Sequence, residues 1–371
     1  CEPATQQVFL PAGHLRLVSR DGLISPRATR PERRREMASN GVGSNAGELV
    51  RPSPFTRGPY QVATFAAPGI KSFTMRVWYP HAQSQSKQRL PLLIFVGGFL
   101  QPENQYANLL STIASHGIMA VGVGWKLTTP LGLNYTGLAD NLGSALAYAS
   151  GEQIKEDLEK MAYPPLSLPR NDSILLGGHS IGNHVTVRRL TSFGCDNIGG
   201  VVLIDPVDGA DPYGVIKQYV IHPPAPVSFM APALHIMTGL DPRRKSWLYP
   251  PCAPAPMSNG RFYRAWRGPI WQWNATEFGH NDVTDSAWKG VLAPCPGNGD
   301  VNALAQYQLT AAGAVAAFTR ALYGREPAAE SGAILDGMVR TPVHVEYARR
   351  AGASAGRLKP FCLPAVSPIE P

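Results

Sequence analysis

The stretch Ser173-Ile-Leu-Leu-Gly-Gly-His-Ser-Ile-Gly182 decides how this chain of 371 residues folds. Its first half is a short apolar run typical of a buried strand, and the residues after Ser180 follow a helical pattern. Gly178 and Gly182 lie two residues before and two residues after the serine. A sharp, closely packed turn from strand to helix needs small residues at those positions, and it lifts the serine hydroxyl clear of the sheet. The stretch therefore predicts a nucleophile elbow with Ser180 at its tip.

Strand and helix patterns alternate on both sides of this elbow. Apolar runs and period-two alternation predict strands over residues 73–79, 90–96, 118–123, 173–176, 201–204, 234–238 and 270–273. Apolar stripes at helical spacing predict helices over residues 106–114, 138–161, 181–193 and 301–322. Strands that alternate with crossover helices build a mostly parallel central sheet with helices on both faces. We therefore expect an α/β class protein with the α/β-hydrolase fold.

The two ends of the chain differ from this body. Residues 1–52 are rich in Arg, Ser, Ala and Gly without any period, which predicts a disordered basic extension; residues 53–330 form the α/β-hydrolase domain, and residues 331–371 form a C-terminal tail. An extension rich in Arg and Ser suits a chloroplast transit segment, although it contains Glu32 and Glu36, and a secretory or vacuolar route is the alternative.

Composition excludes several functional classes. No apolar stretch approaches the ~20 residues of a membrane span, so we expect no transmembrane segment. The net charge of +8 includes seven arginines between Arg16 and Arg35, and because no aromatic and basic groove pattern accompanies it, we expect no nucleic-acid partner. The five cysteines lack the paired spacing of a zinc site, so no metal is expected. Cys252 and Cys295 lie in Pro-rich loops, where a disulfide and two free thiols are equally consistent with the sequence.

A serine hydroxyl becomes an effective nucleophile only beside a base that a third group orients. In this fold the chain order is serine, acid, histidine. Of the nine histidines, His280 lies in Glu277-Phe-Gly-His-Asn-Asp282, directly after the strand over residues 270–273, whereas His344 lies in the tail. The sequence thus predicts His280 as the base.

Three carboxylates follow strands on the correct side of the sheet and are candidates for the acid. Asp205 and Asp208 lie in the segment LIDPVDG, and Asp241 lies in IMTGLDP. We prefer Asp205, since it directly follows the strand after the nucleophile helix, and Asp208 and Asp241 remain alternatives. The two backbone amides that would hold an oxyanion are those of Phe99, after the turn Gly97-Gly98, and of Ile181.

With these pieces placed, the sequence resembles the chlorophyllases, esterases that remove the phytol chain from chlorophyll to leave chlorophyllide and phytol. The likeness covers residues 90–322. The family's GHSRGG elbow corresponds to GHSIGN, its DPVDG stretch is intact at residues 205–209, and its GHMD-like segment corresponds to Gly279-His280-Asn281-Asp282. A Cys-Ala-Pro loop also matches at Cys252. Ile181 and Asn183 depart from the family pattern.

The resemblance implies a carboxylic ester hydrolase with Ser180, Asp205 and His280 as its triad and no cofactor. It implies chlorophyll or a similar hydrophobic ester as substrate, a peripheral contact with pigment-bearing membranes, and a chloroplast location. Aromatic residues near the base suit either an apolar pocket wall or the core: Phe262, Tyr263, Trp266, Trp271 and Trp273. Two alternatives stay open, an esterase or lipase for other hydrophobic esters, as in the platelet-activating-factor acetylhydrolase and polyester hydrolase branches, and a catalytically silent binding protein of the same fold.

Overall fold

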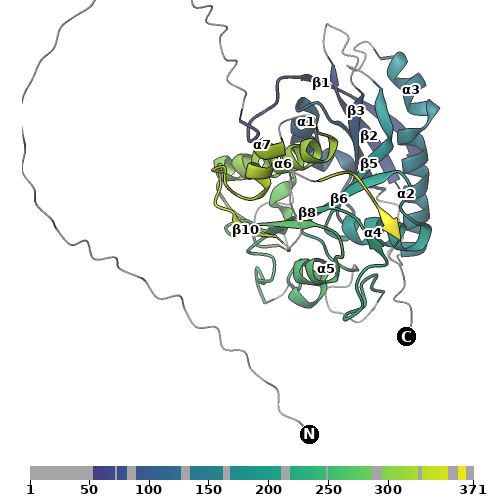
Figure 1. Ribbon diagram of the computed structural model, residues 1–371. Coiled ribbons are helices and arrows are strands. Elements are labelled where there is room, and N and C mark those ends of the chain that lie inside the picture. The colour runs from purple at the N-terminus through teal and green to yellow at the C-terminus, as the bar shows by residue number, and fades with distance from the viewer. Residues whose placement is uncertain are drawn as a thin grey trace, which may run out of the picture. The chain divides into compact units, whose positions relative to one another are not determined.

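The apolar runs of the sequence form the strands of a nine-stranded sheet, and helices cover both of its faces (Figure 1). The computed structural model describes residues 53–71, 73–81, 89–126, 134–161, 168–209, 218–247, 250–285, 295–324, 328–349 and 358–364. Residues 1–52, for which the sequence predicts a disordered extension and a transit segment, lie outside this part of the chain. The chain from Arg51 to Pro371 forms one unit.

The sheet has the order β1-β2-β4-β3-β5-β6-β8-β9-β10. Neighbours from β4 to β9 in this order pair in parallel, whereas β2 is antiparallel to both of its neighbours and β10 is antiparallel to β9. The strands are β1 (Gln61–Ile70), β2 (Phe73–His81), β3 (Leu90–Val96), β4 (Met119–Trp125), β5 (Pro169–His179), β6 (Ile198–Ile204), β8 (Ala233–Thr238), β9 (Ile270–Ala275) and β10 (Glu346–Arg349). A second sheet pairs β7 (Phe229–Met230) with β11 (Leu363–Pro364). The predicted α/β-hydrolase fold is confirmed.

The helices form two layers, with α2, α3 and α4 along one side of the sheet and α1, α6 and α7 along the other (Figure 1). The α-helices are α1 (Ala107–Ser115), α2 (Tyr135–Ser150), α3 (Glu152–Glu159), α4 (Ile181–Phe193), α5 (Asn259–Ala265), α6 (Val301–Tyr323) and α7 (Ala328–Leu335). Three short 3₁₀ helices are η1 (Glu103–Tyr106), η2 (Ala255–Met257) and η3 (His280–Val283). In the described part of the chain, none of the helices combines the length and the apolar character that crossing a membrane requires.

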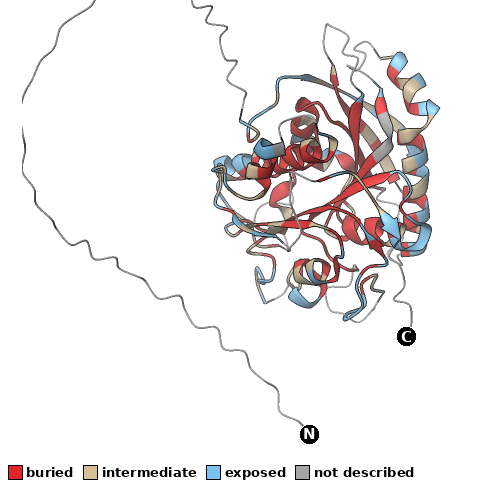
Figure 2. Ribbon diagram, viewed as in Figure 1, coloured by how far each residue is buried: buried red, intermediate tan, exposed pale blue. Residues whose placement is uncertain are grey.

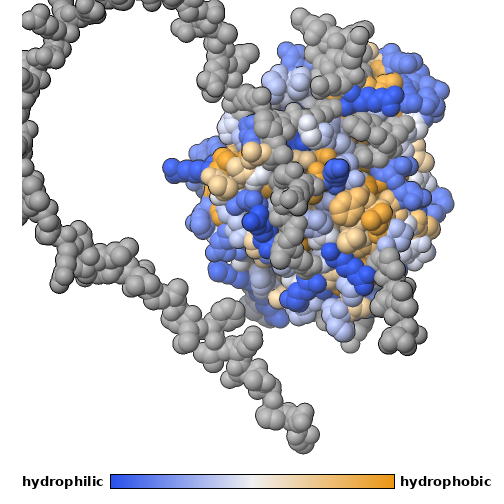
Figure 3. Space-filling view, viewed as in Figure 1, coloured by the Kyte–Doolittle hydropathy of each residue, from blue (hydrophilic) through white to orange (hydrophobic). Residues whose placement is uncertain are grey.

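Alternate residues of the buried strands supply two cores, one under each helix layer. In β3, Leu92 and Ile94 pack with α2 and α4, whereas Leu93 and Phe95 pack with α1 and α6. The central strands are buried throughout, as continuous apolar runs require (Figure 2). Hydrophilic residues cover much of the face in Figure 3, with hydrophobic ones in patches between them. Among the described residues, most of the large apolar side chains are therefore buried.

The aromatic residues near the base belong to this interior. Phe262, Trp266, Trp271 and Trp273 are at most 1% exposed and pack in the two cores. Tyr263 packs partly buried against one of them. Of the two roles that the sequence leaves open for these side chains, the structure gives them the role of core.

Three elements differ from the sequence pattern for physical reasons. The predicted helix over residues 138–161 divides at Gly151, which is extended (ψ −171°) and separates α2 from α3. Strand β1 was not predicted, because it is an edge strand whose residues are half exposed and show no continuous apolar run. The segment predicted as a tail contributes the end of α7 and the edge strand β10, which pairs with β9 through Tyr347 and Trp273.

Two disulfides tie distant segments together. Cys252 pairs with Cys295, which settles the choice that the sequence left open between a bridge and two thiols. Cys195, in the turn after α4, pairs with Cys362 beside β11. This second bridge closes a loop of 167 residues, and the Phe361 amide also donates to the Gly199 carbonyl (3.1 Å). The C-terminal strand is thus fastened to the body next to β6.

We expect the Cys195–Cys362 bridge to stabilise the fold. Changing both cysteines to Ser should lower the free energy of unfolding by about 2–4 kcal/mol, because the unfolded chain regains the entropy of a long loop. Urea unfolding without reductant measures the change. Reductant should still destabilise the double variant through Cys252–Cys295 alone. An unchanged urea midpoint would show that the bridge contributes nothing to stability.

Candidate active site

The turn between β5 and α4 places Ser180 in a conformation that few side chains adopt. Ser180 has φ 55° and ψ −128°, and it directly precedes α4. A Cβ at Gly178 would lie 2.7 Å from the Gly182 carbonyl carbon, and a Cβ at Gly182 would collide with the Val96 carbonyl. Neither position can therefore hold a larger residue without moving the backbone. This is the geometry that the GHSIG segment predicts, with the serine lifted out of the sheet.

His280 lies against this serine. Its Nε2 is 2.8 Å from Ser180 Oγ, which is hydrogen-bond distance. The loop that carries His280 is held by Asp282, whose carboxylate accepts from the amides of Gly279 and Asn298 at 2.8 Å each. Burial lowers the pKa of His280, and the charge of Asp205 opposes this shift. The imidazole is therefore neutral at neutral pH and can accept a proton.

Two carboxylates, rather than one, lie behind the imidazole. Asp241 Oδ2 is 3.6 Å from His280 Nδ1, and Asp205 belongs to the same cluster, in which the polar atoms of all three residues lie within 4.8 Å of one another. Asp205 accepts from the Thr238 amide (2.7 Å) and hydroxyl (2.9 Å). The amide nitrogen of Asn259 lies 3.4 Å from Asp205 Oδ1 and 3.3 Å from Asp241 Oδ2. The preferred acid and one alternative are thus neighbours, and Asp241 is the closer to the base.

The pKa values of both carboxyl groups are raised. Burial and the charge of Asp241 raise the pKa of Asp205 well above its usual range. Burial also raises the pKa of Asp241, but hydrogen bonds from Asp205, Thr238 and Asn259 limit it to about 6. Burial therefore disfavours two negative charges in this pair. Asp241 is the carboxylate nearest to His280 Nδ1.

The spacing of this cluster could in principle admit a metal ion. The hydrogen bonds argue for a different use. His280 Nε2 points to Ser180, Thr238 and Asn259 contact both carboxylates, and the Asn259 carbonyl oxygen is paired with His235 Nε2 (2.9 Å). His280 is thus hydrogen-bonded to Ser180 on one side and lies 3.6 Å from Asp241 on the other.

Asp208, the other alternative acid, has its carboxylate in a separate network. Its oxygens accept from His184 Nδ1 (2.9 Å), Arg261 Nε (2.8 Å) and the amides of Val220 (2.8 Å) and Ile221 (3.1 Å). The residue is fully buried. Asp208 is therefore positioned to anchor the chain around residues 220–221 and Arg261, rather than to contact His280.

The turn after β3 carries the predicted oxyanion donor. The Gly98 amide donates to the Tyr106 hydroxyl (2.8 Å), so it is not available to a substrate. Phe99 and Ile181, whose amides the sequence predicts as donors, both line the cavity beside Ser180. Leu100 has φ 53°, and the Gln101 amide closes the turn on the Gly98 carbonyl (3.0 Å).

A buried network that sequence reasoning missed connects this turn to the base. His179 Nε2 lies 2.8 Å from the His280 carbonyl, so Nε2 carries the proton and donates it. Burial lowers the pKa of His179 well below its usual range, which leaves Nδ1 as an acceptor 2.8 Å from the Tyr106 hydroxyl. Since Tyr106 also accepts from Gly98, the two side chains join the backbone of the base loop to the oxyanion turn. Only the position of His179 next to Ser180 hinted at this role.

Ser180 opens into an apolar cavity of about 380 Å³. Its apolar walls come from four loops and are formed by Phe99, Leu100, Ile181, Val207, Pro250 and Pro251. The disulfide between Cys252 and Cys295 forms another wall, and Asn281 Nδ2 donates to Cys295 Sγ (3.1 Å). The buried aromatic residues of β9 and α5 do not line it. The cavity therefore suits an apolar group beside the nucleophile.

Comparison with known proteins identifies the family. The family model described as chlorophyllase matches residues 54–351. The chain belongs to the chlorophyllase family. Its curated relatives include chlorophyllase-2 of Arabidopsis thaliana, 27% identical over 222 residues, and chlorophyllase-1 of the same plant, 27% identical over 220 residues. These matches cover 54% and 55% of this chain and 63% of each relative, so they span less than two thirds of either relative. Membership of the chlorophyllase family indicates a hydrolase that acts on esters.

The three candidate aspartates can be separated by changing each to Asn. Asp241→Asn should lower turnover by roughly 10⁴-fold, because the base loses its ionised partner. Asp205→Asn should keep activity within about tenfold, since Asp205 lies farther from His280 than Asp241 does and an amide keeps the size of the carboxyl group. Asp208→Asn should lower the free energy of unfolding by about 3–5 kcal/mol, because it breaks a buried ion pair.

Turnover of a short nitrophenyl ester and urea unfolding, measured on all three variants, check these expectations. Urea unfolding of Asp241→Asn serves as the control for its fold. If Asp205→Asn proved inactive while Asp241→Asn kept its turnover, Asp205 would be the orienting acid instead.

We expect the Tyr106 hydroxyl to support the base through His179. Tyr106→Phe should lower kcat on the order of tenfold to hundredfold with little change in KM, because it leaves His179 Nδ1 and the Gly98 amide without their partner. Tyr307→Phe is the matched control, since the buried Tyr307 hydroxyl makes no hydrogen bond within the described residues. Equal losses of kcat in the two variants would contradict the role given to Tyr106.

Proposed function

We propose that this chain is a serine esterase that cleaves the phytyl ester of chlorophyll to chlorophyllide and phytol. The observation that carries the proposal is the 2.8 Å contact between His280 Nε2 and Ser180 Oγ at the tip of the elbow, beside an apolar cavity. Membership of the chlorophyllase family supports the choice of ester. No cofactor enters the proposed reaction.

In the proposed mechanism, Ser180 Oγ attacks the ester carbonyl while its proton passes to His280 Nε2. The amides of Phe99 and Ile181 donate to the oxygen that becomes negative. Collapse of this intermediate breaks the bond to the alcohol, which takes the proton from His280 and leaves as phytol. Water then attacks the acyl-enzyme and gives a proton to His280. Release of the acid returns that proton to Ser180.

The carboxylate pair completes the proposed machinery. Asp241 is the carboxylate nearest to His280 Nδ1, so we assign it the orienting role, with Asp205 as its buried neighbour in the same cluster. This arrangement stabilises the imidazolium that forms when Ser180 attacks. It extends the triad of Ser180, Asp205 and His280 that the sequence predicts, in which Asp205 alone is the acid.

Of the two departures from the family's elbow, Ile181 favours an apolar ester. Ile181 lines the cavity with an apolar side chain. Asn183 is fully buried and donates to the Ile204 carbonyl (2.9 Å), so it fastens α4 to β6 and does not change the cavity. The proposed partner is thus a hydrophobic ester, and a peripheral contact with pigment-bearing membranes is part of the proposal.

The size of the cavity favours a second candidate, an esterase for other hydrophobic esters. Its volume of about 380 Å³ lies at the low end of sites for small molecules. Such a cavity encloses part of a pigment or the whole of a smaller ester.

The cellular compartment is a separate part of the proposal. The proposed substrate favours the chloroplast, whereas two disulfides favour an oxidising compartment such as the secretory or vacuolar route.

The direct test is the release of chlorophyllide from chlorophyll a by the purified chain, followed by chromatography, beside hydrolysis of a short nitrophenyl ester. We expect both activities, and both should vanish in Ser180→Ala, because the acyl-enzyme cannot form. The matched control is Ser111→Ala, a half-buried serine of α1 outside the cavity. Cleavage of the nitrophenyl ester without chlorophyllide would favour the second candidate, and no activity on either ester would point to a binding protein.

A further inference from the structure

A cationic loop with an exposed tryptophan projects beside the candidate active site. It comprises residues 242–247, directly after Asp241, and we call it the basic loop. Arg243, Arg244 and Lys245 are consecutive and exposed, and Trp247 is 84% exposed. Trp247 has the largest exposed fraction among the large hydrophobic side chains of the described residues. Tryptophan side chains are enriched at interfaces, where one side of the indole meets an apolar surface and the other meets water.

The basic loop begins and ends next to segments of the candidate site. On its first side, the Gly239 amide donates to the Ala275 carbonyl (3.1 Å) and the Leu240 amide to the Phe278 carbonyl (3.0 Å), which ties the base of the loop to the segment that leads to His280. On its other side, Pro250 and Pro251 line the cavity. Trp247 thus precedes Pro250, a residue of the cavity wall, by three positions in the sequence.

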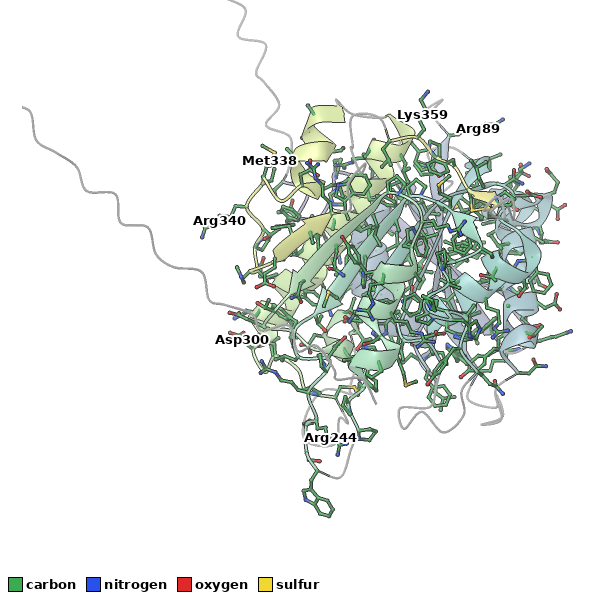
Figure 4. All side chains as sticks on the ribbon, turned by 60° about the horizontal axis from the view of Figure 1, so that its bottom comes forward. Arg89, Arg244, Asp300, Met338, Arg340 and Lys359 are labelled. Carbon is green, nitrogen blue, oxygen red and sulfur yellow. A yellow bond between two sulfur atoms is a disulfide. The ribbon has the colours of Figure 1, made fainter. Side chains whose placement is uncertain are left out.

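Figure 4 shows Arg244 on a loop that projects from one side of the body, opposite Arg89 and Lys359. Arg89 directly precedes β3, so it marks the amino ends of the parallel strands. The basic loop follows the carboxyl end of β8, the same edge of the sheet from which Ser180 emerges. The projecting cations and the opening toward the nucleophile thus share one side of the molecule.

We propose that the basic loop docks on an anionic membrane surface and holds the cavity beside the membrane. An indole prefers the boundary between hydrocarbon and lipid headgroups, and adjacent cations are attracted by negative headgroups. The apolar cavity next to it then receives a lipid-soluble ester from the membrane, and this last step rests on the proposed function. A nucleic acid would fit the cations but not the apolar cavity.

Binding to vesicles tests the docking without any catalysis. Ser180→Ala and the wild type should both sediment with vesicles of phosphatidylcholine containing 30% phosphatidylglycerol, a composition chosen as about one third anionic lipid, and much less with pure phosphatidylcholine. Arg243→Gln combined with Arg244→Gln should weaken binding about 25-fold, at about fivefold for each cation, and Trp247→Ala should weaken it about fivefold or more. Added salt should weaken the binding of the wild type.

Met338→Ala and Arg340→Gln are the matched controls. Met338 is 78% exposed and Arg340 is exposed, and both lie on another side of the body (Figure 4). Their vesicle binding should equal that of the wild type. The basic-loop variants should hydrolyse a short soluble ester at the wild-type rate, which shows that their fold and site are intact.

Three results would overturn the docking proposal: no binding to the anionic vesicles, equal binding by the basic-loop variants, or equal losses in the Met338 and Arg340 controls. Self-association that Trp247→Ala abolishes in the absence of lipid would also overturn it, in favour of a second copy as the partner. Vesicle binding by a chain that releases no chlorophyllide would leave the docking intact and would count against the proposed substrate alone.

Discussion

The close packing between Gly178, Gly182 and the Val96 carbonyl is the constraint on which the rest depends. Because α4 meets β5 and β3 without any intervening side chain, the backbone must reverse within one residue, and Ser180 takes φ 55°. Strain of this kind costs about 1–3 kcal/mol and persists only where the surroundings enforce it. Here parallel pairing on both sides of β5 enforces it, since β3 and β6 leave the turn no room to relax.

Once the serine is fixed, the base and the acids must reach it from other strands. His280 follows β9, Asp241 follows β8 and Ser180 follows β5, so their side chains meet at the carboxyl edge of the sheet although β6 and β8 lie between β5 and β9. Burial disfavours the ionised forms of His280, Asp205 and Asp241. Hydrogen bonds from Thr238 and Asn259 offset part of this cost at the two carboxyl groups.

Local signals predicted the features that local chemistry determines. The buried strands, the elbow and His280 each depend on a short pattern, whether a continuous apolar run, two glycines around a serine or a histidine after a strand. The choice between Asp205 and Asp241 depends on distances between the ends of neighbouring strands. Those distances depend on how the strands pair, which the sequence alone does not give. Sequence patterns likewise could not predict that Tyr106 contacts His179, 73 residues away, or that Cys195 pairs with Cys362, 167 residues away.

The Cys252–Cys295 bridge shows why the cavity and its surroundings behave as one unit. The bridge joins Cys252, in the loop that follows the basic loop, to Cys295, which follows η3 in the sequence. The first residue of η3 is His280, and Asn281 of the same helix donates to Cys295 Sγ. The wall of the cavity is therefore covalently linked to the neighbourhood of the base. Since the same loop begins at Asp241, one stretch of chain holds the acid, presents the exposed Trp247 and closes on the cavity. A surface that contacts Trp247 would therefore contact a segment that is close in sequence to Asp241 and to Pro250 and Pro251 of the cavity wall.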